Sequence, residues 1–319
     1  MSEAGSEPLV CSIICTTYNH SRFCRVALES VYAQDYPHIE IVVIDDGSTD
    51  GNIGELEKVL ARSPYPHKLI AQENTGNVPL NVNRAIAAAT GDYISLFSLD
   101  DLLLPGAISS KMEIVRQDPS MVLVANTCNK EIDDDGETVT EHFESPLYRK
   151  SVESARELLE IEYEQLGTFY NQAAVLQTAM VRAVGGMDPD ISGDDIILRT
   201  KMFKYMVARP ELKFTLLHEP GMAYRKHGTN IHLNTWNQIK TVIDWHGRYF
   251  PDSPLPDLAH RWISHFVYQA LKSGDKQALA KAERYSPVLE AALQDHRKSW
   301  KFRRRRAKAA VRRMLGIRA

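Results

Sequence analysis

Apolar runs alternate with segments of helical spacing along the first hundred residues. The run at 39–44 is β-branched and almost wholly apolar, as is typical of a parallel strand covered on both faces. The alternation predicts an α/β fold with a parallel, doubly wound sheet. The predicted strands are 9–15, 39–44, 68–71 and 93–97, and the helices between them are 22–34, 54–61 and 79–89.

Polar loops follow the first, second and fourth of these runs. Parallel strands end at the same edge of a sheet, and ligands bind beyond that edge. The loop side chains should therefore converge on one cleft; they are Tyr18, Asn19, Asp45, Asp46, Asp100 and Asp101. A dinucleotide-binding oxidoreductase is not indicated, because no GxGxxG motif follows the first run.

The stretch from Ser98 to Asp101 places two adjacent carboxylates at the end of an apolar run. Such a pair is costly to bury unless it faces a cleft or meets a cation. Oxygen ligands suit Mg²⁺ and Mn²⁺, so a metal that carries a diphosphate would meet that need. An aspartate can also cap a helix N-terminus. From these residues alone the helix cap is the favoured interpretation, and the metal site is the alternative.

The second half of the chain continues the pattern and then changes. We expect a helix to Arg116, a strand at 121–125, a turn at 133–136, a helix at 151–161, a return to the sheet at 170–177 and a helix opening at Asp194 and Asp195. The acidic turn lacks the periodic ligands of a calcium loop. Helical spacing dominates from residue 235, so we divide the chain into 1–232, 233–300 and 301–319.

Charge is distributed unevenly over the 319 residues. The net charge is −3, yet residues 301–319 hold nine basic residues and no acidic one, which leaves −12 for the remainder. Val311, Met314, Leu315 and Ile317 can share one face of a basic helix. An anionic surface is the partner that this tail predicts, and an RNA or a solvated end are the alternatives.

Other sequence features predict a cytoplasmic protein. No apolar run approaches the roughly 18 residues of a membrane span, and the acidic N-terminus is unlike a signal peptide. The four cysteines form no CxxC pair, so we expect reduced, mostly buried thiols.

Five motifs in order resemble family 2 glycosyltransferases of the GT-A fold over residues 8–230. They are Thr17-Tyr18-Asn19, the run from Val43 to Asp50, Asn74-x-Gly76, Gly91-Asp92-Tyr93-Ile94 and Asp100-Asp101. The Tyr224-Arg225-x-His227 segment also matches. The resemblance implies a Rossmann-like, mostly parallel sheet flanked by helices, with a helical C-terminal region.

The resemblance also assigns roles to residues. Thr17, Tyr18, Asn19, Asp45, Asp46, Asn74 and Ser98 would bind the donor nucleotide. Asp100, assisted by Asp101 or His227, would hold a divalent metal, Mg²⁺ or Mn²⁺, and Arg225 would contact the diphosphate. Asp195 would be the catalytic base, although Asp194 stands where the family usually has Glu and leaves the choice between the two open. Ser98 stands where the family usually has its first Asp, so the resemblance leaves donor preference and affinity open.

The implied activity is inverting transfer of a sugar from a nucleotide-diphosphate donor to a glycan or lipid-linked acceptor in surface-polysaccharide synthesis. A nucleotidyltransferase is one alternative, but it would need a glycine-rich, basic loop after the first strand, which Thr16–Asn19 is not. A non-catalytic protein that binds RNA or membrane through the tail is the other. With the enzyme interpretation we expect no nucleic-acid partner and a peripheral position at the inner face of the cell membrane.

Deletion of residues 301–319 tests the tail. Each Lys or Arg near an anionic leaflet contributes about 1 kcal/mol of binding energy. We therefore expect the full chain to co-sediment with phosphatidylserine vesicles and the truncated chain to stay in solution. Equal co-sedimentation of the two chains would contradict the membrane assignment, and neutral phosphatidylcholine vesicles are the control.

Overall fold

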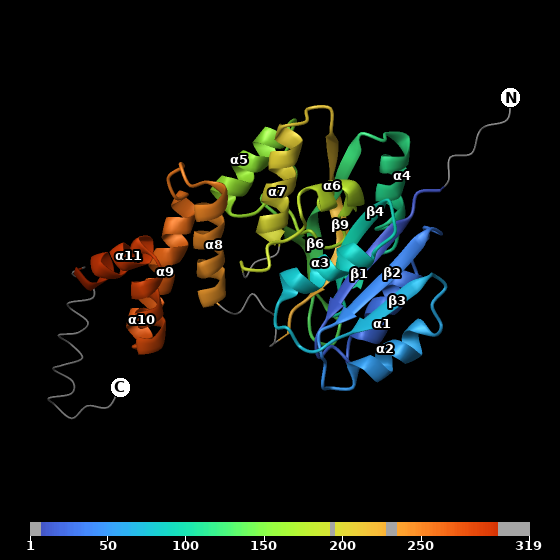
Figure 1. Ribbon diagram of the computed structural model, residues 1–319, viewed down its shortest axis with the longest axis horizontal. Coiled ribbons are helices and arrows are strands. Elements are labelled where there is room, and N and C mark those ends of the chain that lie inside the picture. The colour runs from blue at the N-terminus through green and yellow to red at the C-terminus, as the bar shows by residue number, and fades with distance from the viewer. Residues whose placement is uncertain (1–7, 192–194, 228–234, 299–319) are drawn as a thin grey trace. The chain divides into compact units, whose positions relative to one another are not determined.

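The structure is a computed structural model that describes residues 8–191, 195–227 and 235–298. The chain divides into two compact units, residues 1–231 and 232–319. The first unit holds a mixed sheet flanked by helices, and the second is helical (Figure 1). Asp194 and the basic tail at 301–319 lie outside the described residues.

The first half of the sheet is parallel, as the alternating pattern predicts. Its order is β3 (His67–Ala71), β2 (Ile39–Asp45), β1 (Cys11–Thr17) and β4 (Tyr93–Ser98). Cys11 pairs with Ile39 on one side and with Tyr93 on the other, so the carboxyl ends of β1, β2 and β4 lie at one edge. That edge carries the polar loops.

The second half of the sheet is mixed rather than parallel. It continues as β8 (Val175–Gln177), β6 (Met121–Ile132), β9 (Lys213–Arg225) and β5 (Leu102–Leu103). The short strands β8 and β5 run antiparallel to their neighbours, whereas β6 and β9 run parallel to each other. The predicted turn at 133–136 joins β6 to β7 (Thr138–Glu144) as a hairpin, and so short a connection requires antiparallel pairing. The long strands β6 and β9 nevertheless end at the same edge as β1 and β4.

Strand β9 is the element that the hydrophobic pattern does not reveal. Its sequence contains Pro220 and Gly221, which normally interrupt a strand. Register shifts beside Asn126 and Cys128 accommodate them. A Cβ on Gly221 would lie 2.1 Å from Asn126 Oδ1, and the Asn126 amide donates to the Glu219 carbonyl at 2.8 Å. This close approach keeps β9 in the sheet through its irregular middle.

Helices cover both faces of the sheet, as a doubly wound fold requires. Along β1, Cys11, Ile13 and Cys15 belong to one apolar core and Ile14 belongs to the other. The first core includes α1 (Cys24–Tyr32), α2 (Asn52–Leu60) and α4 (Ser109–Gln117). The second includes α3 (Val78–Ala88), α5 (Ala155–Gln165), α6 (Thr178–Ala183) and α7 (Asp195–Val207). All four cysteines are buried and unpaired.

Residues 235–298, the described part of the second unit, form four helices, in the region where helical spacing predicts them. They are α8 (Thr235–Tyr249), α9 (Asp257–Ser273), α10 (Lys276–Tyr285) and α11 (Pro287–Lys298). Ile239, Ile263, Val267, Leu289 and Leu293 form its apolar core. Among the described residues, no helix has both the length and the apolar character that crossing a membrane requires.

Lys111 is a cation inside the first core. Its side chain is fully buried in α4, and Nζ donates to the Ala107 carbonyl at 2.5 Å. Burial lowers the pKa of Lys111 to about 8. At neutral pH the folded chain therefore carries a poorly solvated charge.

Replacement of this lysine should stabilise the fold. An unfolded lysine keeps its proton to a pH of about 10.4, whereas the folded one keeps it only to about 8. The unfolded state thus binds more protons between these values, and the stability of the native chain rises with pH there. We expect Lys111→Met to raise the free energy of unfolding by about 2 kcal/mol at pH 7 and by less at pH 9.5.

Urea unfolding at the two pH values measures this difference. Lys58→Met, at a largely exposed lysine, is the matched control and should show no such pH dependence. A Lys111→Met protein that is less stable than the native chain at pH 7 would contradict the prediction.

Candidate active site

Two imidazoles and a carboxylate meet at the carboxyl edge of the sheet. His20 follows β1, Asp100 follows β4 and His227 follows β9, and their nearest ligand atoms all lie within 4.8 Å of one another. His227 Nε2 lies 3.0 Å from Asp100 Oδ2, and His20 Nε2 lies 3.8 Å from the same oxygen. Within the described part of the chain, Asp100 Oδ1 is buried and accepts no hydrogen bond. These nitrogen and oxygen donors fit a divalent cation such as Mn²⁺.

The protonation states suit metal binding. Burial opposes ionisation of Asp100, but the hydrogen bond with His227 and the nearby His20 together hold the pKa of Asp100 below its usual value. Burial lowers the pKa of His20, although Asp100 acts in the opposite direction. An ionised carboxylate beside a neutral imidazole is the form in which both groups act as ligands.

Asp101 is placed differently from its neighbour. Its Oδ1 accepts the backbone N–H of Arg225 at 2.7 Å. Burial and the charge of Asp100 raise the pKa of Asp101 well above its usual value. Asp101 lies outside the His20, Asp100 and His227 group, and the structure therefore favours Asp100 over Asp101 as a ligand.

Arg225 joins β9 to the end of β4. Its Nε donates to the Asp100 carbonyl at 2.8 Å, and Nη1 donates to the carbonyls of Asp133 and Asp134 at 3.0 and 3.2 Å. The guanidinium lies 4.8 Å from the centroid of the Phe23 ring. In this arrangement the predicted diphosphate contact is engaged with the backbone, so it positions Asp100.

Hydrogen bonds join the loops after β1 and β2. The Asp45 carboxylate accepts from the Ser48 N–H at 2.8 Å and from the Asn52 amide at 2.7 Å. The same amide donates to Thr17 Oγ1 at 3.1 Å. Asn19 completes the contact, since its N–H donates to Ser48 Oγ at 2.8 Å. Thr17, Asn19 and Asp45 thus lie together, as the strand order predicts.

The loop after β3 closes over Asp46. The Asp46 carboxylate accepts from the Gln72 amide, from the N–H and hydroxyl of Thr75, and from the Gly76 N–H. Burial raises the pKa of Asp46, but these donors outweigh burial and leave the pKa below its usual value. Gly47 has φ +75°, and a Cβ there would lie 2.5 Å from the backbone nitrogen of Asn74. Only glycine fits this contact.

Tyr18 and Ser98 lie at the same edge. The Tyr18 side chain is 45% exposed, which leaves its ring open to a ligand. The Ser98 N–H donates to the Gln172 side chain at 2.9 Å. The seven residues assigned to the donor nucleotide are therefore all at the carboxyl edge of the sheet or in the loop after β3.

Asp195 begins α7 and is held by two donors. Its Oδ2 accepts the Asn171 N–H at 3.2 Å and lies 3.3 Å from Arg199 Nη1. Glu162 of α5 pairs with the buried Arg199, with Nε–Oε2 at 2.9 Å and Nη2–Oε1 at 3.0 Å. The Asp195 side chain stays 29% exposed. The carboxylate is thus fixed in direction and still accessible.

A two-residue segment connects Asp195 to the end of β4. Asn171 holds Asp195, and the adjacent Gln172 accepts from the Ser98 N–H. Because neighbouring Cα atoms are about 3.8 Å apart, Asp195 lies close to the strand end that carries Asp100. A carboxylate and a potential metal group thus share one edge of the sheet.

His20 is the site residue that sequence reasoning missed. It stands in the same polar loop as Tyr18 and Asn19, and its position after the first strand was the available signal. A lone histidine carries little information until its partners are known. Its partners are Asp100 and His227, which come from distant parts of the chain.

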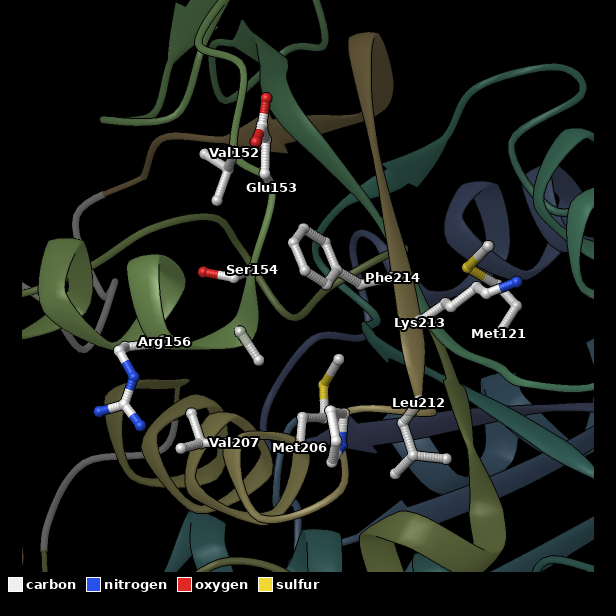
Figure 2. Close-up of a pocket in the computed structure, with 12 residues that line it drawn as sticks. Met121, Val152, Glu153, Ser154, Arg156, Met206, Val207, Leu212, Lys213 and Phe214 are labelled. Carbon is white, nitrogen blue, oxygen red and sulfur yellow. The ribbon is translucent and has the colours of Figure 1, made fainter.

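A separate cavity of about 420 Å³ lies at the opposite edge of the sheet (Figure 2). Met121 and Lys213, which begin β6 and β9, are among the residues that line it. Met206, Val207 and Phe214 give it an apolar wall. None of the residues assigned to the candidate site lines this cavity.

Glycosyl transferase family 2 matches residues 12–181, which is more than half of the chain. Among curated proteins, the chain is 30% identical over 118 residues to the glycosyltransferase GlyG of Streptococcus pneumoniae, covering 37% of this chain and 39% of that protein. It is 33% identical over 143 residues to the chondroitin synthase of Escherichia coli, covering 45% of this chain and 20% of that protein. The chain thus spans less than half the length of these relatives.

Solved structures with the same fold include two glycosyltransferases. The mannosyltransferase PcManGT of Pyrobaculum calidifontis, in complex with GDP-Man and Mn²⁺, has a TM-score of 0.57 at 17% identity and covers 98% of this chain and 89% of that one. S. aureus TarS 1–349, in complex with UDP-GlcNAc, has a TM-score of 0.57 at 15% identity, with 89% and 78% covered. The likeness confirms the GT-A fold that the sequence resemblance predicts.

The two adjacent aspartates should respond differently to substitution. Mn²⁺ that binds the folded chain raises its stability by about 2.7 kcal/mol at one hundred times Kd. We expect Mn²⁺ to raise the Tm of the native chain and of Asp101→Asn, and to leave the Tm of Asp100→Asn unchanged.

Thermal unfolding with and without Mn²⁺ checks this, and circular dichroism shows whether each variant is folded. Loss of the Mn²⁺ shift in Asp101→Asn, with a normal shift in Asp100→Asn, would reverse the assignment.

Proposed function

This chain belongs to glycosyl transferase family 2, and on that premise we propose that it moves a sugar from a nucleotide-diphosphate donor to an acceptor hydroxyl with inversion. The observation that carries the proposal is the joint placement of Asp195 and the His20, Asp100 and His227 group at one sheet edge. One end of such a site can take the leaving diphosphate. The other can take the proton of the acceptor hydroxyl.

The diphosphate end rests on Asp100. His20, Asp100 and His227 would hold the metal, and the orphaned Oδ1 of Asp100 is the donor atom best explained by a cation. Bound Mn²⁺ or Mg²⁺ supplies positive charge against the negative charge that develops on the departing diphosphate. Arg225 fixes the Asp100 backbone, and Asp101 ties the same turn to β9.

The proton-accepting end rests on Asp195. In a single displacement the acceptor hydroxyl attacks from the face opposite the leaving group, so no enzyme nucleophile is needed and one base suffices. Asn171 and Arg199 fix the direction of the carboxylate. Glu162 also pairs with Arg199 at 2.9 Å, so the guanidinium is shared between the two carboxylates. Asp194 is the alternative base in the proposal.

The donor end would use the first three loops. The exposed Tyr18 ring can lie against a nucleobase, and Asp45 and Asp46 can accept from the base or ribose. Ser98 and Asn74 would contact the ribose side of the nucleotide. PcManGT binds GDP-Man and TarS binds UDP-GlcNAc, and both belong to the donor class that we propose.

The acceptor and cellular role complete the proposal. We infer a glycan or lipid-linked acceptor in surface-polysaccharide synthesis, in line with the relation to the chondroitin synthase of Escherichia coli. The basic residues at 301–319 would hold the enzyme at the inner face of the membrane, where lipid-linked acceptors reside.

Asp195→Asn tests the base. A positioned general base contributes roughly 10²–10⁴-fold to a rate. We expect the variant to lose that factor in acceptor-dependent release of nucleoside diphosphate, measured with a panel of UDP- and GDP-sugars and a membrane extract as acceptor. Donor binding, followed by thermal shift, should persist.

Asp188→Asn is the matched control. Asp188 pairs with Lys201 of α7, the helix that Asp195 begins, and it takes no proposed part in catalysis. Near-native turnover in Asp195→Asn would remove the base assignment. Turnover that survives EDTA would remove the metal from the proposal.

A further inference from the structure

An aromatic pair lies beside the candidate base and is not used by the proposed chemistry. Phe143 of β7 and Tyr170 have ring centroids 5.7 Å apart with planes inclined by 37°. Both side chains are half-buried. Tyr170 directly precedes Asn171, whose N–H holds Asp195. The Tyr170 backbone therefore adjoins the residue that holds the proposed base, and the charge of Asp195 acts on the Tyr170 hydroxyl.

A charged pair, Lys226 and Glu131, borders the Phe143 ring. Lys226 Nζ lies 5.5 Å from the centroid of the Phe143 ring and 2.5 Å from Glu131 Oε1. Lys226 directly precedes His227 of the metal group. Thr140 donates to the other oxygen of Glu131 at 3.1 Å. The aromatic pair thus adjoins, through neighbouring backbone, both the residue that holds Asp195 and a residue of the metal group.

The Tyr170 hydroxyl is a polar group that indicates a ligand. Within the described part of the chain, no hydrogen bond engages this hydroxyl, although the ring is half-buried. Burial, followed by the charge of Asp195, raises the pKa of Tyr170, so the group stays a neutral donor. A ligand oxygen above the rings would complete its hydrogen bonding.

We propose that Phe143, Tyr170, Glu131 and Lys226 form the acceptor subsite, and that it takes a neutral sugar ring. A sugar presents an apolar C–H face that suits an aromatic surface and hydroxyls that suit Lys226, Glu131 and the Tyr170 hydroxyl. An acyl chain would offer no hydrogen bond to the charged pair or to the Tyr170 hydroxyl, and an acidic sugar would be repelled by the Glu131 carboxylate. A neutral sugar ring is therefore the ligand that suits both the aromatic faces and the charged pair.

The inference rests on the proposed function for its position beside Asp195, yet it can be tested without turnover. Saturation-transfer NMR detects weak sugar binding in the full chain, with methyl glycosides of glucose, galactose, mannose and N-acetylglucosamine as probes and UDP and Mn²⁺ present. Phe143→Leu keeps an apolar side chain but removes the ring. Tyr170→Phe removes only the hydroxyl.

We expect at least one glycoside to receive saturation in the native chain, with a fall of fivefold or more in Phe143→Leu and a smaller fall in Tyr170→Phe. Trp262→Leu, at an exposed aromatic of the helical unit, should match the native chain. Equal saturation in the native chain and Phe143→Leu would overturn the subsite, as would the absence of saturation for every glycoside or its loss in Trp262→Leu. Circular dichroism checks that the variants fold.

A donor measurement separates the two proposals. Thermal shift of the native chain by UDP-GlcNAc or GDP-Man with Mn²⁺ reports the donor site alone. A donor shift without glycoside binding would overturn the subsite and spare the proposed function. Glycoside binding without any donor shift would overturn the proposed function and spare the subsite as a sugar-binding surface.

Discussion

Two adjacent carboxylates lie at the end of a buried strand, and much of the surrounding structure serves to accommodate them. Asp100 is 8% exposed and Asp101 is 1% exposed, and neither could be buried without compensation. The chain compensates them in opposite ways. Asp100 stays ionised between two imidazoles, whereas Asp101 has a raised pKa and accepts a backbone N–H. Strand β9 supplies a partner to each of them, and so joins the second half of the sheet to the first.

The sequence predicts the part of the fold in which local pattern and tertiary structure agree. Strand β2 is apolar at every position but Glu40 and its last residue, Asp45, because both of its faces are covered, and this is visible in the sequence. The hydrophobic pattern does not predict strand β9. Pro220 and Gly221 are tolerated there because a register shift and the contact with Asn126 accommodate them. The direction of β8 was equally hidden, since a three-residue strand carries no signal of its orientation.

The candidate site likewise has a part that the sequence predicts and a part that it does not. Strand order and loop polarity are enough to predict that Asn19, Asp45 and Asp100 lie at one edge of the sheet. They do not reveal that His20 faces Asp100, because that contact depends on how the first loop turns. The different settings of Asp100 and Asp101 were also out of reach. Consecutive residues look equivalent in a motif, yet their side chains leave the backbone in different directions.

The route of β9 has a consequence for how the chain is made. Met121 of β6 pairs with Lys213 of β9, so this long-range pairing closes late during synthesis. Until Arg225 and His227 emerge from the ribosome, the contacts that they make with Asp100 and Asp101 cannot form. During synthesis the first half of the sheet therefore exists for a time without the β9 partners of its polar carboxyl edge. Nascent chains that stop short of residue 227 would hold the five motifs that end at Asp101 but lack a finished active site.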